Sequence, residues 1–378
     1  MKMVALSRIH GDLPALDAVL QEERGEVATM TEENVNQTNP ASTAGVTSWT
    51  DAYDPFARGR FPVGVRTIQA PDTVRNLLFP CEIWYPAAAR HAGQDLALAT
   101  QDCFTVAPGS TPRSQMAVRN ALAHPGLYPL ILFSHSSGDG RRQSTFLCTH
   151  LSSHGYVVAA LDHSEVIAPE LRRRDGETGE QKTARVQAWI ANRVPDIRLL
   201  LDQLLSGAVW DREVQLDPAR IGIVGHSFGG WTALAVPEVE GRIGAVVALA
   251  PGGSSKPPPN IIPAQLTFRW ERDVPTLYLV AENDTALPLA GMYELFERTR
   301  ATRHMVILRR ADHGHFGDEV EPQAGLCSRE QAHVCVRGLT LCHMDAILRH
   351  VSAAQRFWGG DVEAELAARG VDVMVSGP

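Results

Sequence analysis

Residues 221–230 read IGIVGHSFGG, an apolar run rich in β-branched residues that breaks into a Gly-x-Ser-x-Gly motif around Ser227. In such a motif the serine stands on a tight turn between a strand and a helix, and side chains in place of the flanking glycines would clash. Turn-forming residues 217–220 precede the run, and residues 231–236 are compatible with a helix. The stretch therefore predicts a nucleophile elbow, with Ser227 as the group that attacks an acyl carbon.

Strand-like and helix-like segments alternate along the chain from about residue 53 onward. The alternation predicts an α/β fold with a mostly parallel sheet of about eight strands and helices on both faces. The first two strands are expected to pair antiparallel, and Pro80 in the second indicates an edge strand or a bulge. The expected strands are 63–68, 77–85, 129–133, 156–161, 221–224, 245–249, 275–281 and 304–308, and the expected helices are 144–154, 182–206, 289–300 and one that begins at His343.

Catalytic partners for Ser227 are expected where later strands end, because functional groups in such sheets gather at the carboxyl ends of the strands. One strand runs into Asp284, with Glu282 as the alternative acid, and the next runs into His313, with His315 as the alternative base. A serine hydroxyl is a weak nucleophile near neutral pH, so a histidine must take its proton and a carboxylate must orient that histidine. The chain order of serine, acid and histidine predicts a triad of Ser227, Asp284 and His313.

A metal site is the competing interpretation of the histidine segment, with His313, His315 and Asp318 as ligands. No further ligand follows at a spacing that suits a metal centre. We therefore expect no metal and no organic cofactor.

Acyl transfer also needs donors for the negative charge that develops on the substrate oxygen, and in this kind of fold they are backbone N–H groups. The residue after the nucleophile, Phe228, is expected to supply one of them. The second is expected in the small-residue loop 134–140, at Ser137, with Ser136 as the alternative.

Residues 53–350 resemble the α/β-hydrolase superfamily, and within it the branch of platelet-activating-factor acetylhydrolases and dienelactone-hydrolase-like esterases. The resemblance implies an α/β-hydrolase fold and a small-molecule ester substrate with a short acyl chain. In that branch the histidine stands in a His-x-x-Phe pattern followed by Asp, as His313, Phe316 and Asp318 do here. The matching segments are FSHSSG at 133–138, HLSSHGYVVAALDHSE at 150–165, DPARIGIVGHSFGG at 217–230, VAENDTALP at 280–288 and ADHGHFGD at 311–318.

Two departures from the family pattern bear on function. The oxyanion segment usually reads Ser-His-Gly, whereas this chain has Ser136 in place of the glycine. Dienelactone hydrolases use a cysteine nucleophile, and the serine at position 227 favours general ester hydrolysis over lactone ring opening. A lactone hydrolase, an amidase and a non-catalytic binding relative remain the alternatives.

Composition excludes other classes of function. The chain has 378 residues and a formal charge of −8, which provides no basic surface for nucleic acid. No apolar run approaches the roughly 18 residues of a membrane span, and no signal peptide is apparent, so a cytoplasmic location is expected. The six cysteines are expected to be buried thiols, with a disulfide among Cys327, Cys335 and Cys342 as the alternative. The sequence leaves the oligomeric state open.

The first 50 residues are expected to be an extension and linker ahead of a catalytic domain at 51–378. Residues 1–25 resemble the opening strand and helix of calcineurin-like metallophosphoesterases, but Arg8 stands where that family has a metal-binding Asp before His10. A cation in place of an anionic ligand removes the charge that holds a divalent metal. This segment is therefore interpreted as a fragment without metal chemistry.

Loops after the strands are expected to shape the substrate site. Arg172, Arg173 and Arg174 lie in a charged insertion and are interpreted as a solvated face, with an anionic substrate group as the alternative. The proline-rich segment 251–275 is expected to roof the site, and segment 317–343 to form part of its wall. Four aromatic residues are each expected to pack in the core, with the lining of an apolar pocket as the alternative: Phe228, Trp231, Phe268 and Trp270.

Overall fold

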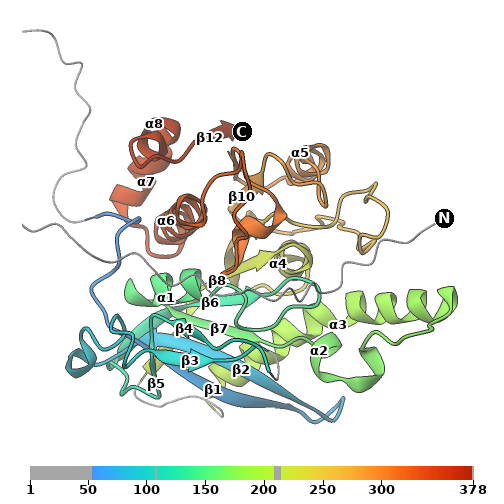
Figure 1. Cartoon of the computed structure of the whole chain (residues 1–378), viewed down its shortest axis with the longest axis horizontal. Coiled ribbons are helices and arrows are strands. Elements are labelled where there is room, and N and C mark those ends of the chain that lie inside the picture. The colour runs from blue at the N-terminus through green and yellow to red at the C-terminus, as the bar shows by residue number, and fades with distance from the viewer. Residues whose placement is uncertain (1–52, 107–108, 208–213, 377–378) are drawn as a thin grey trace, which may run out of the picture. The chain divides into compact units, whose positions relative to one another are not determined.

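A ten-stranded sheet runs through the part of the chain that the computed structural model describes, residues 53–106, 109–207 and 214–376 (Figure 1). Its spatial order is β12-β11-β10-β9-β8-β6-β7-β2-β1-β5. The strands are β1 (Val63–Asp72), β2 (Leu77–Pro86), β5 (Val118–Arg119), β6 (Gly126–Ser134), β7 (Val157–Leu161), β8 (Val214–His226), β9 (Ile243–Leu249), β10 (Thr276–Ala281), β11 (Arg303–Leu308) and β12 (Val373–Ser376), and β3 (Asp102–Phe104) pairs with β4 (Arg113–Gln115) in a separate hairpin.

The centre of the sheet is parallel, as the alternation of strands and helices predicted. Every neighbouring pair from β7 through β6, β8, β9 and β10 to β11 is parallel. The pairs β1–β2, β2–β7 and β11–β12 are antiparallel. The sheet has ten strands rather than eight because the short strands β5 and β12 extend its two edges.

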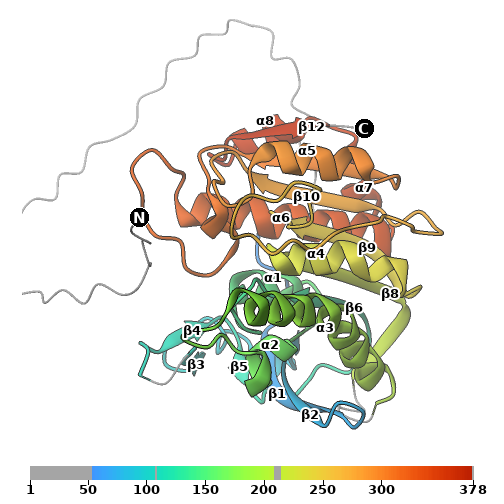
Figure 2. The same cartoon turned by 90° about the vertical axis from the view of Figure 1, so that its right-hand side faces the viewer.

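Helices cover both faces of the sheet, and each face has its own hydrophobic cluster. Side chains alternate along a strand, so in β10 Leu277 and Leu279 join one cluster while Tyr278 and Val280 join the other. Figure 2 looks onto the face covered by α3, α4 and α5. The helices are α1 (Thr145–Ser153), α6 (Arg329–Leu348), α7 (Ser352–Trp358) and α8 (Val362–Ala367) on one cluster, and α3 (Gly179–Leu205), α4 (Phe228–Ala235) and α5 (Leu289–Arg298) on the other, with the short α2 (Ser164–Ile167) ahead of α3.

Local sequence signals account for most element boundaries. Helix α3 begins at a capping box formed by Thr178 and Gln181, and Gly207 follows its end with φ +69°, as the C-terminal glycine predicted. The expected turn at 217–220 lies inside β8, where pairing with β6 skips from Leu216 to Ile221. That segment is therefore a bulge within a longer strand.

Two expectations about the sheet and the last helices were wrong. Strand β2 is not an edge strand, because it pairs with β1 on one side and with β7 on the other. Pro80 is tolerated because the pairing with β7 begins one residue later, at Cys81. The C-terminal helix begins at Arg329 rather than at His343, since Ser328 and Gln331 form a capping box at its start.

Two further expectations concern the state of the cysteines and the presence of a membrane-spanning helix. All six cysteines are free thiols, and every one except Cys103 is buried. No helix within the described residues has the length and hydropathy needed to cross a bilayer. The extension at 1–50 and the metallophosphoesterase-like segment within it lie outside the described residues.

Steric crowding at the elbow generates a stability prediction. A Cβ added to Gly229 would stand 1.9 Å from the Ser134 carbonyl oxygen, so Gly229→Ala should lower the free energy of unfolding by about 1–3 kcal/mol. Gly241→Ala is the matched control, because a Cβ there meets nothing within 4 Å. Thermal unfolding of both variants tests this, and equal midpoints would contradict the steric argument.

Candidate active site

Ser227 occupies a strained turn between the end of β8 and the start of α4. Its backbone has φ +58° and ψ −115°, a region that residues with side chains rarely adopt. The turn closes tightly, because a Cβ on Gly225 would lie 2.0 Å from the Gly229 carbonyl oxygen. Strand, turn and helix thus follow in the predicted order, and the glycines are required for the steric reason that the motif implies.

Three side chains from three strand ends form one hydrogen-bonded row. His313 Nε2 lies 2.9 Å from Ser227 Oγ, and His313 Nδ1 lies 2.6 Å from Asp284 Oδ2. Asp284 is buried in the loop after β10, and its other oxygen accepts hydrogen bonds from the amides of Ala286 and Leu287. With the carboxylate held as an acceptor, Nδ1 carries the proton and Nε2 is left to accept the serine proton.

The alternative acid and base point elsewhere. Glu282 pairs with Arg309 and accepts from the amide of Arg310, away from the row. His315 is buried, with Nδ1 2.7 Å from Asp312 Oδ1 and Nε2 3.1 Å from the Cys327 carbonyl oxygen.

The metal interpretation of the histidine segment finds no support in the geometry. Asp318 accepts from the hydroxyl of Thr145 and the amide of Phe146, so it does not turn toward His313 or His315. Among the described residues, the group whose ligand atoms approach closely enough for an ion includes none of these three side chains.

The two expected oxyanion donors lie on neighbouring segments. Phe228 is the first residue of α4, where a backbone N–H has no acceptor within the helix. Ser137 follows β6, and its N–H makes no hydrogen bond to any residue in the described ranges. The N–H of Ser136, the alternative, is occupied, because it donates to Gln143 Oε1 at 2.9 Å.

The central part of the chain matches a known protein family. The sequence profile of the chlorophyllase family matches residues 98–273. That match includes the elbow and the loop after β6, and it ends before Asp284 and His313.

Curated relatives point in the same direction. The chain is 27% identical to the platelet-activating factor acetylhydrolase of Gallus gallus over 217 residues, which cover 45% of this chain and 51% of that protein. It is 26% identical to the chloroplastic chlorophyllase-1 of Citrus unshiu over 197 residues, 48% of this chain and 54% of that one. The chain thus spans about half the length of the curated relatives it matches.

A solved structure extends the similarity over most of the chain. The ferulic acid esterase from Streptomyces cinnamoneus superposes with a TM-score of 0.57 at 26% identity, covering 78% of this chain and 93% of that one. The chain has the α/β-hydrolase fold. Its resemblance to an esterase branch of that superfamily, indicated by the sequence, is confirmed by these similarities.

Two residues near this row, His226 and Gln143, were not singled out from the sequence. Burial, together with the nearby His313 ring, holds the pKa of His226 well below its usual range, so the ring is neutral. Its Nδ1 lies 2.8 Å from Gln143 Nε2 and its Nε2 lies 3.1 Å from the His313 carbonyl oxygen. Since Gln143 also binds the Ser136 amide, one chain of hydrogen bonds joins the loop after β6 to the histidine segment. The position of His226 beside Ser227 in the motif was the available signal.

A cavity of about 640 Å³ opens beside His313 and His226. Its wall carries several charged side chains, among them Arg141 and Arg142, which both contact Glu82. The other charged lining residues are Arg113, Asp139, Asp162, Asp318 and Glu319, so charges of both signs face the space.

The aromatic and arginine residues of these loops lie where the favoured interpretations placed them. Phe228, Trp231 and Phe268 are buried in the hydrophobic cluster on the α4 face and do not line this cavity. Arg172, Arg173 and Arg174 are exposed, as expected for a solvated face.

The buried His315 generates a pH prediction. Burial alone would lower its pKa, but hydrogen bonds with Cys327 and Asp312 outweigh that effect and raise the pKa of His315 to about 9. A raised folded-state pKa gives stability that is fully present below the ordinary histidine pKa of 6.5 and is lost as the pH rises through about 9. The stability difference between the wild type and His315→Gln should therefore shrink between about pH 6 and about pH 10. Thermal unfolding across that range tests this, and a constant difference would contradict it.

Proposed function

We propose that this chain hydrolyses carboxylic esters through an acyl-enzyme on Ser227. The observation that carries the proposal is the continuous row from Asp284 through His313 to Ser227 at the elbow. A non-catalytic binding protein of the same fold would not require a histidine that is oriented by a buried carboxylate and positioned to accept a serine proton. The row therefore favours catalysis over a non-catalytic role.

The reaction follows from the positions of these atoms. Ser227 Oγ attacks the ester carbon while its proton moves to His313 Nε2, and the resulting imidazolium is stabilised by Asp284. The oxyanion of the tetrahedral intermediate accepts hydrogen bonds from the N–H groups of Phe228 and Ser137. The C–O bond to the alcohol then breaks as His313 returns the proton to the leaving oxygen. Water attacks the acyl-enzyme by the same route, releasing the acid and restoring Ser227.

The substrate is proposed to be a small ester with a short acyl chain and a polar group. The similar proteins are named a platelet-activating factor acetylhydrolase, a chlorophyllase and a ferulic acid esterase. Because the cavity beside His313 is lined by charged side chains of both signs, a polar portion of the substrate fits it better than a long hydrocarbon chain. An ester is favoured over an amide because the protein whose structure superposes on most of this chain is a ferulic acid esterase.

Removal of the nucleophile tests the proposal directly. Ser227→Ala should abolish turnover of a nitrophenyl acetate ester and labelling by a fluorophosphonate, with an unchanged thermal unfolding midpoint. Ser114→Ala, on the exposed side of β4, is the control and should keep both. Substantial esterase activity in the Ser227→Ala variant would overturn the mechanism.

Substitution of the acid tests its assignment. Asp284→Asn should lower kcat by about 10⁴-fold, because an amide at this position favours the wrong imidazole tautomer. Glu282→Gln is the matched control and should leave kcat near the wild-type value, since Glu282 pairs with Arg309 instead. Steady-state kinetics on the same ester measure both, and the reverse pattern would assign the acid to Glu282.

A further inference from the structure

Arg193 of α3 is a buried cation directly behind the proposed oxyanion site. Its side chain is fully buried, and Nη1 donates to the His135 carbonyl oxygen at 2.5 Å while Nη2 donates to the Ser136 carbonyl oxygen at 3.2 Å. The guanidinium also lies over the Phe228 ring, 4.3 Å from its centroid. One side chain therefore contacts both segments whose N–H groups are proposed to bind the oxyanion.

The contact with the Ser136 carbonyl fixes the direction of the next amide. A trans peptide is planar, so its C=O and N–H point in opposite directions. The Ser136 oxygen accepts from Arg193 and also from His135 Nδ1 at 2.7 Å, since His135 Nε2 is occupied by the amide of His163. With its oxygen held on the Arg193 side, this peptide must direct the Ser137 N–H to the opposite side.

The neighbouring peptide is fixed from both of its ends. The His135 oxygen accepts from Arg193, and the Ser136 N–H of the same peptide donates to Gln143 Oε1. Rotation of the Ser136–Ser137 peptide would thus have to break the contacts of Arg193 and His135 together. This loop is therefore held in one orientation before any substrate binds.

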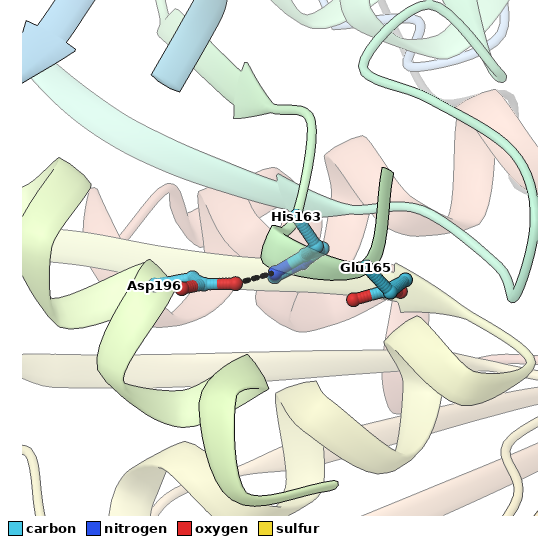
Figure 3. Close-up of side chains that lie close together, drawn as sticks. All are labelled: His163, Glu165 and Asp196. Carbon is cyan, nitrogen blue, oxygen red and sulfur yellow. Dashed lines mark hydrogen bonds and ion pairs between the residues drawn. The ribbon is translucent and has the colours of Figure 1, made fainter. Parts of the chain in front are cut away.

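Acidic side chains around α2 and α3 stabilise the buried cation. Figure 3 shows His163 between Asp196, which it contacts, and Glu165. These three groups are close enough to hold a metal ion. Glu165 however pairs with Arg193 and Asp196 pairs with Arg75, so two cations already balance the two carboxylates. These ion pairs account for both carboxylates, and Glu165 is the one that contacts Arg193.

We propose that Arg193 is a positioning residue of the oxyanion hole, which holds the Ser136–Ser137 peptide so that the Ser137 N–H faces the tetrahedral intermediate. The inference rests on the proposed ester hydrolysis and extends it to a residue that does not touch the substrate. In its absence the peptide can rotate and present a carbonyl oxygen, which repels the oxyanion instead of binding it.

The test removes Arg193 without leaving its partner as an unpaired buried charge, which would itself destabilise the fold. The double variant Arg193→Met with Glu165→Gln, which removes both charges of the pair, is compared with the wild type. Leu200→Ala, a buried change on the same helix, controls for loss of stability. The readouts are kcat and KM for nitrophenyl acetate, the pH–rate profile, and inhibition by an alkyl trifluoromethyl ketone, whose adduct with serine carries an oxyanion.

The double variant should lose about 10²–10³-fold in kcat, the effect of one oxyanion donor, with KM little changed. Ketone affinity should fall by a similar factor, while the pH midpoint of kcat/KM stays in place because His313 and Asp284 are untouched. A folded double variant with the kcat and ketone affinity of the wild type would overturn the proposal, as would equal losses in Leu200→Ala.

A second variant decides the question if the double variant does not fold. Arg193→Lys keeps the charge, but a compact ammonium lacks the planar fork that reaches two carbonyl oxygens and a carboxylate at once. It should still lose kcat and ketone affinity together, and full retention of both would overturn the proposal. Fluorophosphonate labelling of wild-type Ser227 separates the two proposals: without that label ester hydrolysis itself fails, whereas with it only the role of Arg193 is in question.

Discussion

The close approach of Gly229 to the end of β6 is the contact on which the rest of the site depends. Only a residue without a side chain lets α4 begin so near the Ser134 carbonyl oxygen, and this brings the turn around Ser227 beside the loop that follows β6. Because β8 and β6 are parallel neighbours, both segments leave the sheet at the same edge. The proposed nucleophile and the two proposed oxyanion donors thereby meet without any long-range loop having to reach across.

Polar groups buried beneath this edge stabilise the arrangement that the elbow creates. Arg193 and Glu165 would each cost several kcal/mol if left unpaired in the interior, yet they contact one another and the loop backbone. On the other side of the loop, Gln143 and the neutral His226 connect the Ser136 amide to the His313 backbone. The site thus has a supporting layer of hydrogen bonds on both sides of the loop after β6, which fixes its geometry in advance of substrate.

Much of the fold was predictable because its signals are local. Hydrophobic periodicity located the parallel strands, and the position of Asp284 and His313 just after two of them indicated a common edge. The start of α6 was not predicted because charged residues follow Ser328 and interrupt the apolar pattern. Ser328 and Gln331 nevertheless have the spacing of a capping box. The edge strands β5 and β12 were missed because runs of two and four residues carry almost no periodicity of their own.

The sequence by itself determined the elbow, the parallel core and the chain order of serine, acid and histidine, since each depends on residue type and local spacing. Only the tertiary structure decided which of these groups meet: Asp284 rather than Glu282 contacts His313, and His313 rather than His315 contacts Ser227. It also showed that the amide of Ser136 is occupied by Gln143. Residues one or two positions apart in a loop share the same sequence context, and they are distinguished by which group turns back over the sheet edge. The role of Arg193 was likewise invisible in the sequence, because a buried arginine on a helix acquires meaning only from the distant backbone that it contacts.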